Sequence, residues 1–354
     1  MTVSLCVIAY NEESLIRGLL DDISKQDYPH ELIEVIFVNN GSTDTTPDLL
    51  SSFANINSDF LRVCIRTQER SNQACGWNTA ISNAMGDVII RIDAHGRIPH
   101  SYVSACVKEL EKGEKIVGGG RPCIAQFNTP WSNTLLAAEE CLFGSSVMGY
   151  RRVHEKKEYL SSLFHAAYRR EVFAKVGGFN INLGRTEDNE IHYRMRKAGY
   201  KFACCPTISS NQYIRNSFLG MVKQKYSNGL WIGLTLSVCP ACLSLLHFAP
   251  FALVAATVIS VIMAVLGTPW FLLALAVIYI AFDLAISVGA ILYNTFNRTK
   301  LLLPFMFPIL HFSYGIGTLF GILGMIPWRI SHSGKSAKAA IRRVKVDVRQ
   351  NTIE

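Results

Sequence analysis

Charged side chains are almost absent from residues 236–328, where Asp283, Arg298 and Lys300 are the only Asp, Glu, Lys or Arg. Of the 354 residues of the whole chain, 49% are apolar and 18% are charged. Because the rest of the chain has an ordinary composition, the sequence predicts a soluble-type domain joined to a membrane region. The net charge of +8 is also uneven, since seven Lys or Arg stand against two Asp or Glu from Arg329 onward. This distribution excludes a uniformly basic nucleic-acid-binding protein.

The ten cysteines lack the spacing of a disulfide framework or a zinc site, because only Cys204-Cys205 and Cys239-Pro-Ala-Cys242 come in pairs. We therefore expect reduced thiols. The amino-terminal segment lacks a basic run and a cleavage site around Val3–Ala9, which indicates a buried first strand rather than a signal peptide. We expect the large domain to stay in the cytoplasm.

Short apolar runs alternate with helical patterns up to about residue 210. The predicted strands cover residues 3–9, 34–38 and 88–92, and the predicted helices lie near 13–25, 45–54 and 73–84. This βαβ pattern predicts an α/β fold with a mostly parallel sheet. Polar loops follow the three strands, and ligands of such sheets bind beyond the carboxyl ends of the strands. We expect the three loops to meet at one edge of the sheet.

Four apolar segments follow. Residues 214–235 mix apolar side chains with Arg215, Lys223 and Lys225, a pattern typical of an amphipathic helix at a membrane interface. The other three are each long enough to span a bilayer and lie near 243–266, 270–292 and 301–326. The predicted division is a catalytic-type domain over 1–213 and an interfacial helix over 214–235. An all-α membrane region over 236–328 and a basic cytoplasmic tail over 329–354 follow.

The first two spans form a predicted hairpin through Gly267-Thr268-Pro269. A third full crossing would place the basic tail outside the cell, against the positive-inside tendency. Because Pro304 and Pro308 interrupt segment 301–326, we expect this segment to be re-entrant or to lie along the interface. A genuine third span is the alternative.

Asp93 and His95 stand two residues apart at the end of a predicted strand. A carboxylate and an imidazole there could bind a divalent cation that bridges a diphosphate, either Mg²⁺ or, because of the histidine, Mn²⁺. The alternative is a capping aspartate and a surface histidine in a turn.

Several motifs together resemble those of family 2 glycosyltransferases. They are Ala9-Tyr10-Asn11-Glu12, the loop Asn39-Asn40-Gly41-Ser42-Thr43-Asp44, the stretch 78–89 that includes Gly86-Asp87-Val88-Ile89, and Asp93-Ala94-His95. The pattern of residues 91–95 and the hydrophobic carboxyl-terminal region resemble the succinoglycan-type exopolysaccharide glycosyltransferases. The resemblance implies a GT-A fold, which is Rossmann-like with a mostly parallel sheet, followed by an all-α membrane region.

The resemblance also implies site residues. Those expected to bind the nucleotide or the donor are Ala9, Tyr10, Glu12, Asn40, Asp44, Asp93 and Arg215, with Asp93 and His95 at the metal. Tyr10 is similar to the residue that packs on the nucleotide base. Many relatives have two aspartates where this chain has Asn39-Asn40, but an amide can still pair with uracil, so a UDP-sugar is the expected donor.

Asp188 lies in the acidic run 186–190 and resembles the aspartate that acts as general base in inverting enzymes. Such a base is needed because the acceptor hydroxyl must lose its proton as it attacks the sugar. Capping of a helix amino terminus is the alternative role for this run. Weaker candidates near the acceptor are His165, Glu187, Gln224 and Trp231, whereas we expect Arg121 to belong to a solvated face.

The predicted function is a membrane-attached inverting glycosyltransferase of the cytoplasmic membrane, with its catalytic domain in the cytoplasm. It would transfer a sugar to a lipid-linked or growing saccharide in bacterial exopolysaccharide or cell-surface polysaccharide synthesis. The expected partners are the UDP-sugar, this acceptor and membrane lipid, with polysaccharide-assembly proteins as further candidates. The alternatives are a polyprenyl-phosphate glycosyltransferase and a non-catalytic scaffold that binds sugar nucleotides.

Overall fold

The computed structural model describes residues 1–144, 149–293 and 295–351, and the chain divides into two compact units. The first unit combines residues 1–122, 149–212 and 333–351. The second contains residues 123–144, 213–293 and 295–332. Each unit has a hydrophobic core of its own.

The first unit is built on an eight-stranded sheet in the order β3-β2-β1-β4-β9-β6-β10-β8. Strands β1, β2, β3 and β4 are mutually parallel where they pair, and β6 is parallel to β10, whereas β9 and β8 run antiparallel to their neighbours. The strands of this sheet are β1 Val3–Ala9, β2 Ile33–Asn39, β3 Arg62–Thr67, β4 Val88–Asp93, β6 Ile116–Gly120, β8 Glu158–Leu160, β9 Ala167–Arg169 and β10 Phe202–Ser209. The short β5 Gly96–Arg97 pairs with β11 Asn211–Tyr213.

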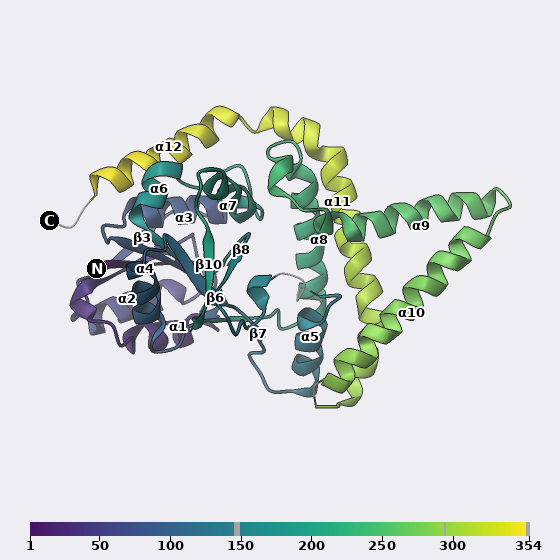
Figure 1. Cartoon of the computed structure of the whole chain (residues 1–354), viewed down its shortest axis with the longest axis horizontal. Coiled ribbons are helices and arrows are strands. Elements are labelled where there is room, and N and C mark those ends of the chain that lie inside the picture. The colour runs from purple at the N-terminus through teal and green to yellow at the C-terminus, as the bar shows by residue number, and fades with distance from the viewer. Residues whose placement is uncertain (145–148, 294, 352–354) are drawn as a thin grey trace. The chain divides into compact units, whose positions relative to one another are not determined.

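Helices cover both faces of this sheet (Figure 1). One face packs against α1 Ile16–Ser24, α2 Thr46–Ile56 and α4 Tyr102–Glu111. The other face packs against α3 Gln73–Ser82, α6 Arg170–Val176, α7 Glu187–Lys197 and α12 Gly334–Gln350. The predicted strands and helices are therefore confirmed, with the first helix beginning three residues later than expected.

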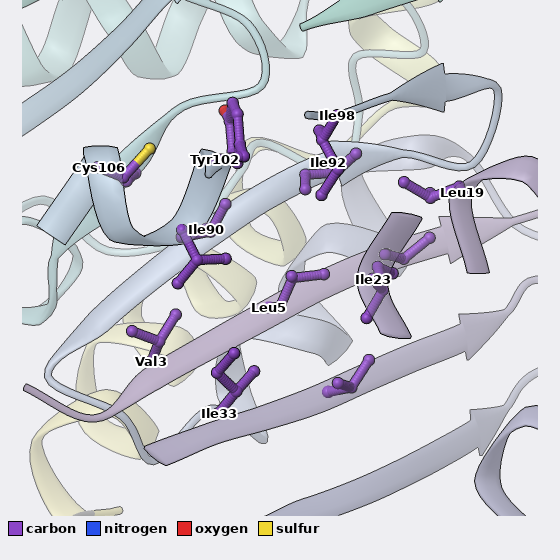
Figure 2. Packing of buried hydrophobic residues seen from close by; sticks show 14 of the residues in the cluster. Val3, Leu5, Leu19, Ile23, Ile33, Ile90, Ile92, Ile98, Tyr102 and Cys106 are labelled. Atoms are coloured by element: carbon purple, nitrogen blue, oxygen red, sulfur yellow. The ribbon is translucent and has the colours of Figure 1, made fainter. Parts of the chain in front are cut away.

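The core of the first unit follows from the two-residue period of strands. Val3, Leu5 and Val7 of β1 belong to one core cluster, whereas Cys6 and Ile8 belong to the cluster on the opposite face. Figure 2 shows the first cluster, in which side chains of the strands meet those of α1 and α4. Both faces of β1 are buried, so its residues are apolar except for Ser4, whose hydroxyl donates to Glu34.

The second unit is mostly helical. Its elements are β7 Cys123–Ile124, α5 Pro130–Glu140, α8 Phe218–Thr235, α9 Ala249–Val265, α10 Trp270–Tyr293 and α11 Leu303–Ser331. Three segments in the described residues are long and apolar enough to cross a membrane, namely Leu245–Val265, Trp270–Tyr293 and Arg298–Ser331. The predicted turn between the first two is present, and Gly267 adopts the left-handed conformation with φ +95°.

The third segment forms one continuous helix, α11, and its expected re-entrant or interfacial placement stays a prediction. Pro304 lies in the first turn, where a helix needs no backbone N–H, and Pro308 is accommodated inside the helix. A helix along the interface and a full span both remain compatible with this geometry. That the segment spans the membrane stays a prediction.

The predicted interfacial segment 214–235 contains α8, which packs against α11 through glycines. A Cβ atom on Gly229 would lie 2.0 Å from the carbonyl oxygen of Tyr314, and one on Gly317 would lie 2.2 Å from that of Tyr226. The two backbones therefore touch directly, as small residues allow in helix pairs of membrane proteins. Contact of α8 with lipid headgroups stays a prediction.

The observed units differ from the predicted division at two places. Residues 123–144 belong to the second unit, although they were expected in the catalytic-type domain. The predicted tail from Arg329 is not a separate segment, because α12 joins the core of the first unit through Val344 and Val348. The many charged residues of this tail drew attention away from its apolar residues, which recur at the spacing of one helix face.

Candidate active site

The three predicted loops meet at one edge of the sheet. The register of the parallel strands places Ala9 beside Asn39 and Ile8 beside Asp93, so β1, β2 and β4 end together. The first two loops are joined, because the Asn11 side-chain oxygen accepts from Thr43 N at 2.8 Å. Asn11 has a left-handed backbone with φ 52°, which asparagine tolerates better than most residues.

Asp93 lies at the centre of a cluster of hydrogen-bond donors. Its Oδ2 atom accepts from Arg121 Nη1 at 3.2 Å and from Gln212 Nε2 at 3.3 Å, and it lies 3.3 Å from His165 Nε2. Burial alone would raise the pKa of Asp93, but the hydrogen bond with His165 and the charge of Arg121 hold it well below its usual range. Asp93 is therefore an ionised carboxylate in the folded protein.

Arg121 does not belong to a solvated face, so that expectation is wrong. The residue is 4% exposed, and its guanidinium lies over the ring of Phe164 at 4.9 Å from the centroid. A buried arginine needs a counter-charge, and Asp93 supplies it. Arg121 thus adds positive charge at the strand end where a diphosphate is expected.

His95 points its two ring nitrogens at different partners. Nδ1 lies 3.3 Å from Glu12 Oε1, and Nε2 lies 2.6 Å from Gln212 Nε2. An amide N–H that donates to Nε2 leaves the proton of the ring on Nδ1, facing the carboxylate of Glu12. The predicted residues Glu12, Asp93 and His95 are therefore brought together, and Gln212 from β11 joins them.

The residues at this point fit a divalent cation, although no group of three His, Cys, Asp or Glu side chains suited to a metal is found among the described residues. Asp93 Oδ2 and His95 Nε2 converge on the amide nitrogen of Gln212. The lone pairs of Asp93 Oδ2 and His95 Nε2 that accept from this amide could instead bind one cation. Rotation of the Gln212 amide by half a turn would add an oxygen ligand.

His165 is buried against Asp93, and its contact with an acceptor stays a prediction. It is 4% exposed, its Nδ1 lies 3.0 Å from Ser210 Oγ, and its carbonyl accepts from the hydroxyl of Tyr102. Burial lowers the pKa of His165 to about 4. Its φ is 54°, and a Cβ on Gly96 would lie 2.6 Å from its ring, so a glycine is needed there.

Asp188 is held by Arg91, a residue of β4 that the sequence analysis did not single out. Arg91 Nη1 donates to Asp188 Oδ1 at 2.8 Å, and the two side chains are 7% and 14% exposed. The guanidinium of Arg91 lies over the rings of Trp77 and Phe179, at 4.2 and 4.5 Å from their centroids. Two aromatic faces and a carboxylate therefore fix Arg91.

Arg91 and Asp93 are two residues apart, so they lie on the same side of β4. One strand thus carries both the carboxylate of the predicted metal site and the cation that orients the predicted base. The first turn of α7 supplies Asp188 itself.

Glu187, next to Asp188, differs from it in environment. The residue is 2% exposed, and its Oε2 atom has no hydrogen-bond partner among the described residues. Burial, together with the charge of Asp188, raises the pKa of Glu187 to about 8. Burial and the neighbouring carboxylate thus favour the neutral form of Glu187.

The nucleotide side of the site contains Tyr10, whose ring lies under the guanidinium of Arg70 at 4.6 Å. The side chain of Asn40 is already engaged, because it donates to the carbonyl of Ser71 at 2.7 Å and accepts from Gln68 at 2.8 Å. Asn40 therefore shapes the loop that carries Arg70. Asp44 accepts from the backbone N–H of Glu13 at 3.1 Å and so joins the first two loops.

Three predicted site residues belong to the second unit. Arg215 is exposed, and Gln224 and Trp231 lie on α8. The ring of Trp231 lies perpendicular to that of Trp328 on α11, with 6.0 Å between centroids. Their contact with donor or acceptor stays a prediction.

Known proteins resemble this chain in sequence and in fold. Residues 4–177 match the model of the family "Glycosyl transferase family 2". A dolichyl N-acetyl-α-D-glucosaminyl phosphate 3-β-D-2,3-diacetamido-2,3-dideoxy-β-D-glucuronosyltransferase of Methanococcus voltae is 24% identical over 66% of this chain and 73% of its own. The succinoglycan biosynthesis protein ExoA of Rhizobium meliloti is 27% identical over 64% of this chain and 68% of its own.

Among solved structures, the mannosyltransferase PcManGT of Pyrobaculum calidifontis, in complex with GDP-Man and Mn²⁺, superposes with a TM-score of 0.56. It is 20% identical, and the match covers 90% of this chain and 87% of that protein, which shows a common fold. The chain therefore has the GT-A fold and matches the family 2 glycosyltransferase model over residues 4–177, and three helices among its described residues are long and apolar enough to span a membrane.

Proposed function

We propose that this protein is a membrane-attached inverting glycosyltransferase that transfers a sugar from a nucleotide sugar to the hydroxyl of a lipid-linked or growing saccharide. The observation that carries the proposal is the arrangement on β4, where Asp93 stands at the strand end and Arg91 holds Asp188. This arrangement joins a site for the departing diphosphate to a carboxylate that can accept a proton.

The donor that we propose is a UDP-sugar. The side chains of Tyr10 and Arg70 offer a ring and a cation to a nucleotide at the ends of β1 and β2. Since the related PcManGT was solved with GDP-Man, a test of the donor must include guanosine as well as uridine nucleotides.

A divalent cation, Mn²⁺ or Mg²⁺, would be held by Asp93 and His95 with Gln212 beside them. When bound, such a cation stabilises the negative charge that develops on a leaving diphosphate. Glu12 orients His95 by holding the Nδ1 side of its ring. Arg121 contributes a fixed positive charge next to the same carboxylate.

Asp188 is the proposed general base. Its Oδ1 is occupied by Arg91, so we assign Oδ2 to the proton of the acceptor hydroxyl. The rings of Trp77 and Phe179 that contact Arg91 keep the pair in place. This matters because a positioned carboxylate contributes about 10² to 10⁴-fold to such a proton transfer. Glu187 is almost fully buried, which makes it the less accessible of the two carboxyl groups.

The proposed acceptor is at the membrane. The three candidate spans would hold the enzyme there, with the catalytic domain on the cytoplasmic side. Among the relatives, one is named for a dolichyl-linked acceptor and another for succinoglycan biosynthesis, which supports a lipid-linked or polysaccharide acceptor.

The experiment that tests this function measures the release of nucleoside diphosphate from UDP- and GDP-sugars by the full chain in nanodiscs, with Mn²⁺ or with EDTA. We expect turnover of a UDP-sugar that requires the metal and that Asp93→Asn abolishes, while Asp21→Asn, at an exposed position of α1, leaves it intact. Binding of the nucleotide without turnover, even with lipid-linked saccharide present, would favour a scaffold. Turnover with polyprenyl phosphate that survives Asp188→Asn would instead indicate a phosphate acceptor.

A further inference from the structure

Helix α12 has two faces of opposite character. Ala337, Val344 and Val348 are at most 4% exposed and lie on the side that packs against α3 and α6. The outward side carries a basic set, of which all but the half-buried Lys345 are exposed: Lys335, Lys338, Arg342, Arg343, Lys345 and Arg349. Asp347 is the only acidic residue of the helix.

The apolar face of α12 is held on the first unit by hydrogen bonds and close packing at both ends of the helix. Gly178 N donates to the carbonyl of Ile341 at 3.2 Å, and a Cβ on Gly178 would lie 2.5 Å from the side chain of Val344. At the other end of the helix, Arg170 Nη1 donates to the carbonyls of Val348 and Asn351 at 2.8 and 2.6 Å. The rotation of α12 about its axis is therefore set, and its basic side faces away from the core.

The basic side is barely neutralised within the protein. In the part of α12 that the structure describes, the only ion pair joins Arg343 to Asp347 at 3.7 Å. Six cations and one carboxylate leave a net charge of +5 on a helix of 17 residues. Such a density of positive charge on one face fits a surface that is itself densely negative.

The chain itself brings α12 close to a candidate membrane span. Helix α11 ends at Ser331 and α12 begins at Gly334, so three Cα steps, about 11 Å, separate them at most. If α11 enters the bilayer, the first turn of α12 starts near the headgroups. Basic helices in this position are attracted by anionic lipid.

We propose that the outward basic face of α12 binds an anionic lipid surface, so that the catalytic unit carries a membrane contact of its own in addition to the apolar helices of the second unit. This contact is independent of the proposed glycosyl transfer. It also assigns a role to the Gly177-Gly178 turn, which holds α12 with its charges outward; Gly177 adopts φ +84°, a conformation that glycine favours.

The test uses the full chain in nanodiscs of phosphatidylcholine, with or without about one third of phosphatidylglycerol. An amine-reactive reagent and mass spectrometry measure the reactivity of each lysine. We expect Lys335, Lys338 and Lys345 to react about threefold more slowly in the anionic discs and to recover in about 0.5 M NaCl. Lys108 and Lys197, exposed on α4 and α7, serve as internal references and should react equally in both discs.

Two double variants test whether the protection of the α12 lysines depends on the positive charge of this helix. Arg342→Gln combined with Arg343→Gln leaves the lysine reporters in place and should remove most of the protection, whereas Arg17→Gln combined with Lys25→Gln, both exposed, should retain it. Equal reactivity of the α12 lysines in both kinds of disc would overturn the proposal. So would equal protection in neutral discs, protection that survives the arginine changes, or protection by inorganic phosphate alone, which would indicate a phosphate site.

Discussion

The two units of this protein distribute their apolar side chains in opposite ways. In the first unit, Val3 and Leu5 are fully buried between layers of helices. In the second unit, Val265, Trp270 and Leu292 are 82%, 73% and 78% exposed on helices that contain almost no charge. The first unit is thus organised for water around it, and the second for an apolar surrounding such as lipid.

The units also differ in how their helices and strands are held. Interlocked side chains and buried ion pairs organise the first unit, including Arg91 with Asp188. In the second, α8 and α11 approach so closely through Gly229 and Gly317 that the backbones touch. A charge change should therefore damage the first unit most, and the contact of α8 with α11 in the second unit should not tolerate an added side chain.

The largest loss of stability is expected from Arg91→Met. It leaves the carboxylate of Asp188 buried without its cation, which costs about 3–5 kcal/mol for a buried pair. Thermal unfolding followed by tryptophan fluorescence measures the effect. The matched change Lys25→Met breaks an exposed pair with Asp21 and should cost less than about 1 kcal/mol. Equal effects of the two changes would remove the distinction between buried and exposed pairs.

A pH-dependent effect is expected at Glu187. Its pKa of about 8 in the folded protein lies above the ordinary value of 4.5, so the folded protein keeps a proton that the unfolded chain releases. Stability should fall as pH rises from about 4.5 to about 8, by a few kcal/mol, and then level off. Glu187→Gln should flatten this dependence, so that the variant matches the wild type near pH 5 and exceeds it near pH 8. A variant with an unchanged pH profile would show that another group is responsible.

Steric crowding should disturb the second unit by a smaller amount. Gly317→Leu forces a side chain into the backbone of α8 and should cost about 1–3 kcal/mol in detergent. Gly289→Leu is the control, because nothing lies within 4 Å of a Cβ at that position of α10. If both changes are tolerated equally, the close approach of α8 and α11 is not needed for stability.

The smallest effect concerns the proposed metal. Gln212→Ala removes the amide on which Asp93 and His95 converge and should weaken Mn²⁺ about tenfold. Electron paramagnetic resonance of free Mn²⁺ during titration measures this directly. Asn211→Ala, one residue away on β11, should leave the affinity unchanged, and a Gln212 variant with wild-type affinity would exclude this residue from the metal site.

The sequence predicts most of the fold and the strand-end part of the site. Apolar runs mark β1, β2 and β4 because these strands are buried on both faces, and the polar residues after them must then share one edge. Asp93 and Asp188 follow from their positions at a strand end and in the first turn of a helix. The position of Asp93 near His95 suggested a metal site, whereas the family resemblance suggested the role of Asp188.

The remaining site residues were missed for physical reasons. Arg91 interrupts an apolar strand and resembles an edge or surface position until its aromatic neighbours Trp77 and Phe179 are seen. Gln212 is 117 residues from His95 and belongs to no local motif. The packing of α12 on the first unit depends on tertiary contacts of Gly178, which no pattern in the tail indicates.

The central claim is that Asp188 accepts the proton of the acceptor in a glycosyl transfer. The most direct measurement compares nucleotide affinity and transfer rate for the wild type, Asp188→Asn and Asp21→Asn in nanodiscs, at saturating donor, Mn²⁺ and saccharide acceptor. We expect Asp188→Asn to bind the nucleotide normally but to transfer the sugar about 10² to 10⁴-fold more slowly, and Asp21→Asn to do both at the wild-type level. Transfer at the wild-type rate by Asp188→Asn would contradict the account.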